Sequence, residues 1–332
     1  MQNAVILKKA SETKAEFGEV PEKRSIQRLL DFGVVNIDKP EGPTSHQVAD
    51  FVQKILGITK SGHGGSLDPK VTGVLPVALG KATRIVQTWL KAPKEYVCVM
   101  HLHKEVPEAE LRKIMSFFVG TIDQVPPLKS SVKRVSRKRN VYYLTILEID
   151  GKDVLFQVGC EAGTYIRKLC HDVGLKLGGA HMANLRRTKA GPFDESTLVT
   201  LHDLADAFYY HRGGNEKFLR HCIHPPEEGI SHLPKIWVHD TTVDTLCHGA
   251  DLSVPGISKL HDDVQKGSLV AVMSLKDELI CLAETKMNSE EMKRKEKGLA
   301  AKTTKVFMEP GLYPKYKPSI QDTSRGNDLN LL

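Results

Sequence analysis

Apolar and polar residues follow one another in patterns that predict strands and helices in mixed order. Short apolar runs predict strands at residues 32–38, 74–79 and 95–102. Helical spacing predicts helices at residues 45–56, 82–90 and 107–118, with Ser45 as the N-cap of the first and Gly57 closing it. Because strands often adjoin one another, the pattern indicates an α+β fold around a largely antiparallel, mixed sheet with flanking helices.

The rest of the chain predicts a hairpin, a helix and a second, β-rich unit. Alternating strands at residues 141–149 and 154–160 are joined across Asp150-Gly151, and Thr164 is the expected cap of a helix ending near residue 177. From about residue 232, a short helix at 243–247 and strands at 268–275, 278–285 and near 305–308 are expected. We therefore predict four parts, namely an N-terminal extension (1–30), a main domain (31–230), a β-rich domain (231–310) and a polar tail (311–332).

Composition and charge narrow the class of protein. The 332-residue chain has a net charge of +7, and residues 129–139 hold six Lys or Arg residues and no acid, which favours an anionic partner. The six cysteines are scattered without the paired spacing of a zinc ribbon or a disulfide framework, so neither a metal site nor disulfides are expected. No apolar run reaches membrane-spanning length, which predicts an intracellular protein with no membrane partner.

The candidate chemistry centres on one carboxylate. Residues 62–69 read Gly-His-Gly-Gly-Ser-Leu-Asp-Pro, so Asp68 lies in a glycine-rich turn that an apolar strand follows. Glycine lets the backbone approach a ligand closely, and Pro69 biases the preceding residues away from helix. The turn would present an acid to a pocket, although an isolated Asp-Pro would more simply be an Asx-turn.

The longer string, residues 62–75, resembles the catalytic motif of the TruB family of RNA pseudouridine synthases, with Asp68 in the place of the catalytic aspartate. Lys94-Glu-Tyr96 resembles the family's Lys-x-Tyr motif, whose tyrosine stacks on the target base. Residues 163–169 resemble the motif whose arginine, here Arg167, pairs with the aspartate. Alone, Tyr96 would be a half-buried strand aromatic and Arg167 a surface arginine. Three motifs in the family's order argue instead for catalytic roles of Asp68, Tyr96 and Arg167.

The same resemblance implies RNA contacts and no cofactor. His63 takes the place of the histidine that enters the RNA stem as the uridine leaves it, although a packed turn histidine is an even alternative. Arg186 lies in a motif expected to contact phosphate. The basic run, residues 129–139, takes the place of a loop over the substrate in the family. An exposed, solvated loop is the alternative, but the resemblance favours RNA binding by Lys133, Arg134, Arg137, Lys138 and Arg139. Since isomerising uridine involves no redox change and no external nucleophile, no cofactor is needed.

Other features resemble the dyskerin-type branch of the family, the catalytic subunit of H/ACA guide-RNA complexes. Residues 248–257 resemble a PUA domain, an RNA-binding β-barrel, and residues 306–315 resemble the closing segment of dyskerin-type proteins. After residue 103 the chain lacks the insertion of stand-alone tRNA-modifying members. The N-terminal extension is of the kind that packs on the PUA domain in that branch.

This branch implies an H/ACA guide RNA, an rRNA or tRNA substrate and three protein partners. They are a small zinc-ribbon scaffold protein, a glycine-arginine-rich-type accessory protein and an L7Ae-like kink-turn protein. Because the Lys/Arg-rich tails of eukaryotic members are missing, an archaeal, cytoplasmic protein is favoured over a eukaryotic, nucleolar one. Two alternatives stay open: a stand-alone tRNA pseudouridine synthase, and a non-catalytic RNA-binding scaffold, which would be expected to lose at least one of the three catalytic residues.

Overall fold

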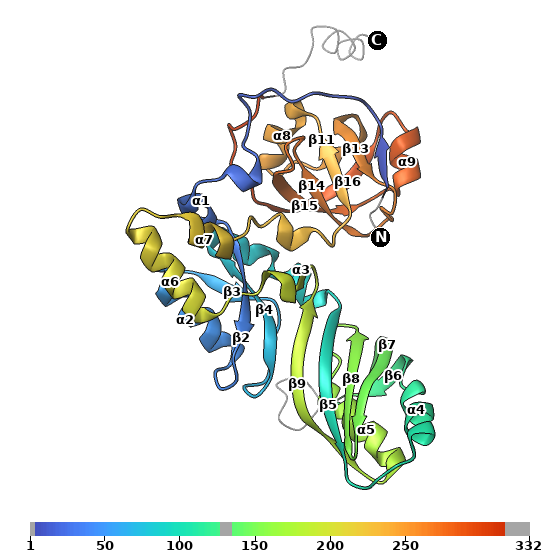
Figure 1. Ribbon diagram of the computed structural model, residues 1–332. Coiled ribbons are helices and arrows are strands. Elements are labelled where there is room, and N and C mark those ends of the chain that lie inside the picture. Colours follow the sequence, from blue (N-terminus) through green and yellow to red (C-terminus); the bar gives the residue numbers. More distant parts are fainter. Residues whose placement is uncertain (1–3, 127–134, 316–332) are drawn as a thin grey trace, which may run out of the picture. The chain divides into compact units, whose positions relative to one another are not determined.

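A computed structural model describes residues 4–126 and 135–315 of the chain, which divides into two compact units (Figure 1). The smaller unit combines residues 1–24 with 230–332, and the larger consists of residues 25–229. Helix α1 (Ile26–Asp31) belongs to the larger unit, where its residues Ile26, Leu29 and Leu30 are buried in the core. The sequence analysis placed this division six residues later, after residue 30.

One mixed sheet forms the centre of the larger unit. Its main path runs β2-β4-β9-β5-β8-β7-β6, with β3 added to β4 and β10 to β9. The strands are β2 (Val34–Lys39), β3 (Ser61–His63), β4 (Thr72–Leu79), β5 (Lys94–Leu102), β6 (Gly120–Gln124), β7 (Arg137–Asp150), β8 (Asp153–Cys160), β9 (Ala180–Ala190) and β10 (Phe193–Asp194). Among these described strands β4 and β9 pair in parallel and the other pairs are antiparallel, which confirms the predicted α+β class.

Of the helices that the structure describes in this unit after α1, the first four overlap predicted helices, with differences at the caps, and the last two were not predicted. These helices are α2 (Ser45–Leu56), α3 (Val86–Lys91), α4 (Glu108–Ser116), α5 (Ile166–Leu177), α6 (Leu201–Arg212) and α7 (Lys217–Cys222). Thr44, rather than the predicted Ser45, is the N-cap of α2, because it forms a capping box with Gln47. Thr164 does not cap α5 as predicted, since its hydroxyl donates to the carbonyl of Glu161 and Tyr165 is the N-cap. The segment predicted as one helix at 82–90 is a 3₁₀ turn (Gly80–Ile85) followed by α3.

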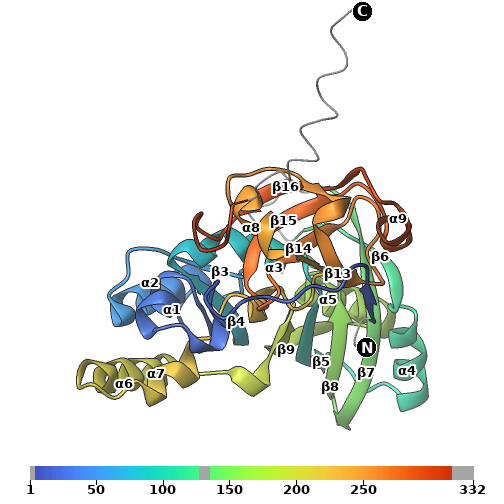
Figure 2. The same ribbon diagram turned by 90° about the horizontal axis from the view of Figure 1, so that it is seen from above.

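Two hydrophobic cores lie on either side of the β4–β9 pairing. Helices α1, α2, α6 and α7 enclose the first against β2 and β4, whereas α4 and α5 enclose the second against β5 and β8. Figures 1 and 2 show α2 at one end of the sheet and α4 beside β6 and β7 at the other. Leu67 and Val71 belong to the second core and Leu75 and Val77 to the first, so the intervening chain links the two. The segment that contains Asp68 is therefore anchored from both sides.

The smaller unit has its own sheet and core. The strand order is β1-β13-β11-β14-β15-β16-β12, with β11 and β14 parallel. The strands are β1 (Val5–Leu7), β11 (Lys235–Val238), β12 (Leu252–Ser253), β13 (Ile257–His261), β14 (Leu269–Met273), β15 (Leu279–Thr285) and β16 (Leu299–Val306), and the helices are α8 (Asp240–Cys247) and α9 (Ser289–Arg294). Strand β1, from the N-terminal extension, pairs with β13 through Val5 and His261. Residues 4–7 thus complete a sheet whose other strands come from the last third of the chain.

Candidate active site

The loop that carries Asp68 is fixed by a buried lysine. Lys39, at the end of β2, is fully buried and donates hydrogen bonds to the carbonyls of Pro40 (2.8 Å), Pro69 (3.0 Å) and Val71 (2.8 Å). Burial lowers the pKa of this ammonium group, and the nearby negative charge of Asp68 opposes that effect. Because two of the three acceptors lie just after Asp68, the lysine holds the loop without occupying the carboxylate.

The other end of the same loop is held by a serine. Ser45, in the first turn of α2, accepts a hydrogen bond from the Leu67 amide at 2.8 Å, and its hydroxyl lies 3.4 Å from the Leu67 carbonyl. Ser45 is 2% exposed. The predicted capping residue therefore positions the residue next to Asp68.

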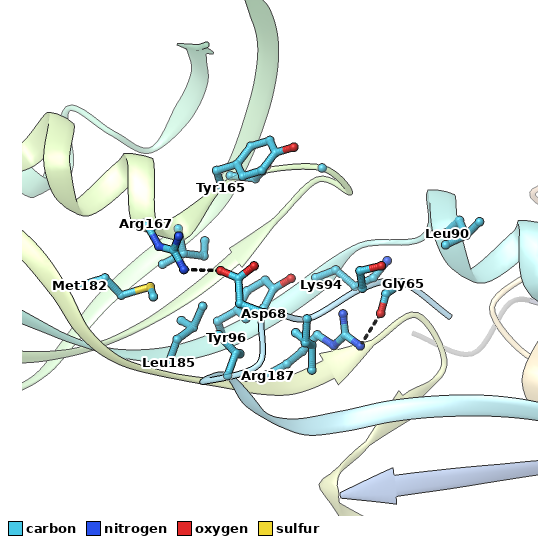
Figure 3. A pocket seen from close by; sticks show the side chains of 16 residues that line it. Gly65, Asp68, Leu90, Lys94, Tyr96, Tyr165, Arg167, Met182, Leu185 and Arg187 are labelled. Atoms are coloured by element: carbon cyan, nitrogen blue, oxygen red, sulfur yellow. Dashed lines mark hydrogen bonds and ion pairs between the residues drawn. The ribbon is translucent and has the colours of Figure 1, made fainter. Parts of the chain in front are cut away.

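Asp68 and Arg167 form an ion pair. The Nη2 atom of Arg167, in the first turn of α5, donates to Oδ2 of Asp68, and both side chains are about half exposed, at 51% and 56%. Figure 3 shows the guanidinium group pointing at the carboxylate across the mouth of a cavity. In the free protein this carboxylate remains open to solvent.

Tyr96 and Arg187 form the floor of the cavity. They face each other on β5 and β9, and both line the cavity. Arg187 is 1% exposed and also donates to the carbonyls of Val74 (2.7 Å) and Gly65 (3.2 Å). Burial raises the pKa of Tyr96, so its phenol is neutral at pH 7. Arg187 thus connects β9, which pairs with β5, to the loop that carries Asp68.

The cavity has a volume of about 460 Å³, which falls in the range of small-molecule sites. Among the residues that line it, Lys94, Arg167 and Arg187 are cationic and Asp68 is the one carboxylate. Burial lowers the pKa of Lys94 to about 8, and its ammonium group donates to the carbonyls of Trp89 (2.9 Å) and Ala92 (2.6 Å). Three cations around one carboxylate favour an anionic substrate such as a nucleotide.

His63 and Arg186 lie outside the cavity wall. His63 is half-buried on β3, and burial, Arg187 and His46 together lower its pKa. Arg186 is held by Asp38 through two hydrogen bonds of 3.0 Å and by Glu195 at 2.6 Å, so an RNA phosphate would compete with two carboxylates. These arrangements leave the RNA-binding roles of His63 and Arg186 as predictions.

The predicted basic loop is in part a strand. Residues 137–139 begin β7 and pair with β6, rather than lying in a loop as the sequence suggested, because the antiparallel ladder extends four residues beyond the predicted hairpin. Arg139 lies against the cavity wall, since a side chain at Gly163 would meet its Nη2 atom at 3.1 Å. Lys133 and Arg134 fall outside the described residues.

Three cavity residues were not assigned a role from the sequence. Lys94 opens the Lys-x-Tyr motif, and Arg187 directly follows Arg186 in the motif expected to contact phosphate. A lysine or arginine that binds backbone carbonyls leaves no periodic pattern in the sequence that would indicate its role. Tyr165 also lines the cavity, and its place directly before α5 was hidden by the expectation that Thr164 caps the helix. Had β9 been predicted as a strand paired with β5, the position of Arg187 opposite Tyr96 would have indicated its role.

Within residues 4–126 and 135–315, no group of three or more His, Cys, Asp or Glu side chains is arranged to hold a metal ion. The six cysteines all lie in these ranges and are free and buried. None of the helices described there is both long enough and apolar enough to cross a membrane.

Family models match almost the whole chain. Residues 53–166 match the TruB family pseudouridylate synthase (N terminal domain) and residues 167–231 the tRNA pseudouridylate synthase B C-terminal domain. The probable tRNA pseudouridine synthase B of Pyrococcus furiosus is 56% identical over 308 residues, which cover 92% of this chain and 91% of that protein. Its counterpart in Methanopyrus kandleri is 54% identical over 313 residues, with 94% and 93% covered. The chain therefore belongs to the TruB family and is an RNA pseudouridine synthase.

Matches outside the catalytic domain identify the branch within that family. Residues 234–307 match the PUA domain and residues 1–49 the DKCLD (NUC011) domain. The chain resembles the crystal structure of a Cbf5-Nop10-Gar1 complex with a TM-score of 0.92 and 54% identity, covering 95% of this chain and 97% of that one. An H/ACA RNP structure bound to a substrate RNA containing 2′-deoxyuridine matches with a TM-score of 0.90 and 52% identity, covering 95% and 98%. The protein is a pseudouridine synthase of the dyskerin type, as the resemblance predicted.

Proposed function

We propose that this protein converts uridine to pseudouridine in rRNA at positions chosen by a bound H/ACA guide RNA, with Asp68 as the catalytic carboxylate. The observation that carries the assignment is the Asp68–Arg167 ion pair at the mouth of a cavity that Tyr96 and Arg187 also line. Asp68, Tyr96 and Arg167 all line this cavity, although 99 residues separate the first from the last in the sequence.

The residues of the cavity suit the chemistry. The reaction breaks the N1–C1′ bond of uridine, turns the base and joins it again through C5. Asp68 would act either as a nucleophile on the sugar or as a base at C2′, and in both roles it must be ionised and oriented, which Arg167 favours through a charge-assisted hydrogen bond. The neutral Tyr96 ring offers a surface on which the base stacks. Because Asp68 is open to solvent, bound RNA has to supply the exclusion of water.

The proposed guide RNA and partners rest on the relatives. The solved structures that this chain resembles over 95% of its length are, by their titles, a Cbf5-Nop10-Gar1 complex and an H/ACA RNP with substrate RNA. By that similarity we infer an H/ACA guide RNA, a zinc-ribbon scaffold protein, a glycine-arginine-rich-type accessory protein and an L7Ae-like kink-turn protein as partners. RNA contacts by His63, Arg186 and the basic run, and a cytoplasmic location, belong to the same proposal.

One rival substrate is favoured by a specific observation. The relatives with 54–56% identity carry the name probable tRNA pseudouridine synthase B, so tRNA without a guide is the second candidate. The missing insertion after residue 103 speaks against it, because stand-alone members use that segment to hold tRNA. The structure has a short turn there between β5 and α4.

Release of tritium from RNA labelled at C5 of uridine separates these candidates. One arm contains the protein with tRNA, and the other contains the protein, a guide RNA, the partner proteins and a matched rRNA target. Release only in the guided arm supports the proposal. Equal release from tRNA alone would instead identify the protein as a stand-alone tRNA pseudouridine synthase. The Asp68→Asn variant, nearly isosteric, should assemble and bind RNA but release no tritium above background, and turnover by this variant would refute the role of Asp68.

A further inference from the structure

Helix α5, which carries Arg167, lacks the capping box that α2 and α6 of the same unit have. In α2 the Thr44 amide donates to Gln47 at 2.8 Å, and in α6 the Thr200 amide donates to Asp203 at 2.9 Å, so each helix closes its own capping box. In α5 the N-cap is Tyr165 and no side-chain cap is formed. The position that would supply the acceptor is Lys168, which has no acceptor to offer.

A glutamine from a distant strand takes over this role. Gln124, the last residue of β6, accepts a hydrogen bond from the Tyr165 amide at 2.9 Å and donates one to the Tyr165 carbonyl at 3.2 Å. Its side chain is 2% exposed, so both bonds are shielded from water. One primary amide thus pairs with both backbone groups of Tyr165, as a neighbouring strand would.

The residue held in this way lies at the edge of the active site. Tyr165 lines the cavity, and Arg167, two residues further on, forms the ion pair with Asp68. Tyr165 ends the loop at residues 161–165, which joins β8 to α5. The other end of this loop is held by β7, where the Glu161 amide donates to the Asn140 carbonyl at 2.8 Å. With the loop fixed at both ends, the amide of Gln124 determines where the first turn of α5 begins and hence where the guanidinium group is presented.

We propose that Gln124 is a positioning residue for the isomerisation reaction. It sets the start of α5 through the backbone of Tyr165, and so places Arg167 against Asp68. The proposal rests on the function proposed above, because it requires the Asp68–Arg167 pair to take part in the reaction. Gln124 itself does not line the cavity and touches no reacting atom.

The first test replaces Gln124 by methionine, which keeps the length of the side chain and removes both hydrogen bonds. Gln53→Met is the matched control, since Gln53 also bonds between elements of this unit, donating to Ser61 at 2.9 Å, but lies outside the cavity lining. In single-turnover assays with saturating enzyme, Gln124→Met should lower the rate constant by about 10- to 100-fold with RNA affinity unchanged. Gln53→Met should leave both at the wild-type level.

The second test uses Gln124→Glu and a pH profile. A protonated carboxylic acid offers one donor and one acceptor and can replace the amide, whereas an ionised carboxylate cannot donate to the Tyr165 carbonyl. The rate constant of this variant relative to wild type should therefore rise as the pH falls. A loss of packing alone would not produce that pH-dependent rescue.

Two results would overturn the inference. One is a wild-type single-turnover rate for Gln124→Met, and the other is a ratio of Gln124→Glu to wild type that does not change with pH. These outcomes are distinct from failure of the proposed function, which activity of Asp68→Asn would show instead. Should Gln124→Met fail to fold, the pH profile of Gln124→Glu still decides.

Discussion

Three buried cations around the candidate active site donate their hydrogen bonds mainly to backbone carbonyls. Lys39 and Lys94 bind carbonyls of the surrounding loops, and Arg187 binds two more. The Asp68 carboxylate therefore has Arg167 as its ion-pair partner while remaining accessible at the cavity mouth. Lys94 and Arg187 thus add positive charge to the cavity without pairing with Asp68, and the exposed Arg167 alone of the cavity's cations forms an ion pair with it.

Loss of the Arg167 charge should abolish activity at little cost in stability. Because the ion pair is about half exposed, Arg167→Met should change the free energy of unfolding by less than about 1 kcal/mol. The single-turnover rate should fall about 10²–10³-fold, as for removal of one preorganised electrostatic contact. Arg112→Met, which removes the exposed Arg112–Glu108 pair on α4, should alter neither quantity. Equal activity of both variants would exclude a catalytic role for Arg167.

Lys94 should make stability depend on pH. Its pKa is lowered from 10.5 to about 8, so between these values the unfolded chain binds more protons than the folded one. The contribution of Lys94 to the free energy of unfolding therefore rises with pH across this window, by on the order of 3 kcal/mol at most. Urea unfolding at pH 7.5 and pH 10 should show wild type gaining relative to Lys94→Met. A difference that stays constant between these two pH values would contradict the lowered pKa.

At the scale of elements, the site depends on the parallel contact between β4 and β9. Gly73 pairs with Arg187 at a φ of +100°, and a Cβ atom there would lie 2.2 Å from the Arg187 carbonyl oxygen. Gly73→Ala should therefore destabilise the larger unit by about 2–5 kcal/mol and reduce activity, because it separates the strand of Arg187 from the Asp68 loop.

Gly120→Ala is the control for that substitution. Gly120 has a similar φ of +96°, but nothing lies within 4 Å of its Cβ position. It measures backbone strain without the clash, at about 1–2 kcal/mol. Chemical unfolding of both variants separates the two effects, and equal losses would mean that strain alone, and not the approach of the two strands, makes glycine necessary at position 73.

Elements with a clear period were predictable from the sequence, and those without one were not. The hairpin around Gly151 was predicted because apolar and polar residues alternate there, and the strand at residues 95–102 was predicted from its apolar run. Both are present. Strand β9 was missed, since its sequence Ala-His-Met-Ala-Asn-Leu-Arg-Arg-Thr-Lys-Ala has no regular alternation. Its arginines are accommodated by partners far away in the sequence, such as Asp38 and the Val74 carbonyl. No local pattern contains that information.

The candidate site follows the same division. The turn chemistry around Asp68 indicated a presented acid, and motif order brought in Tyr96 and Arg167. What could not be predicted is the support: Lys39 reaching Pro69, and Gln124 capping a helix 41 residues further along the chain. These contacts form between elements, so they depend on the tertiary fold rather than on sequence spacing.

At the scale of the whole molecule, the smaller unit joins both ends of the described chain. Glu278 is 1% exposed and accepts hydrogen bonds from the Glu19 amide at 3.0 Å, from Ser274 at 3.0 Å and from the Tyr313 hydroxyl at 2.5 Å. Phe17 also packs near the Tyr313 ring, with centroids 6.0 Å apart. A single buried carboxylate therefore connects the N-terminal segment, the turn between β14 and β15, and the segment after β16.

Glu278→Gln should loosen this unit specifically. The amide keeps the volume of the side chain but replaces one acceptor oxygen by a donor group, which removes the acceptor either of the Glu19 amide or of the Ser274 and Tyr313 hydroxyls and costs about 2–4 kcal/mol. Hydrogen exchange of the full-length protein should show faster exchange in β1 and β13–β15, while α5 and β9, which pack in a separate core, keep their protection. Glu284→Gln on β15 is the matched control, because Glu284 is half exposed and pairs only weakly with Lys286. If both variants exchanged alike, the N-terminal segment would be held by β1 pairing with β13 and not by the carboxylate.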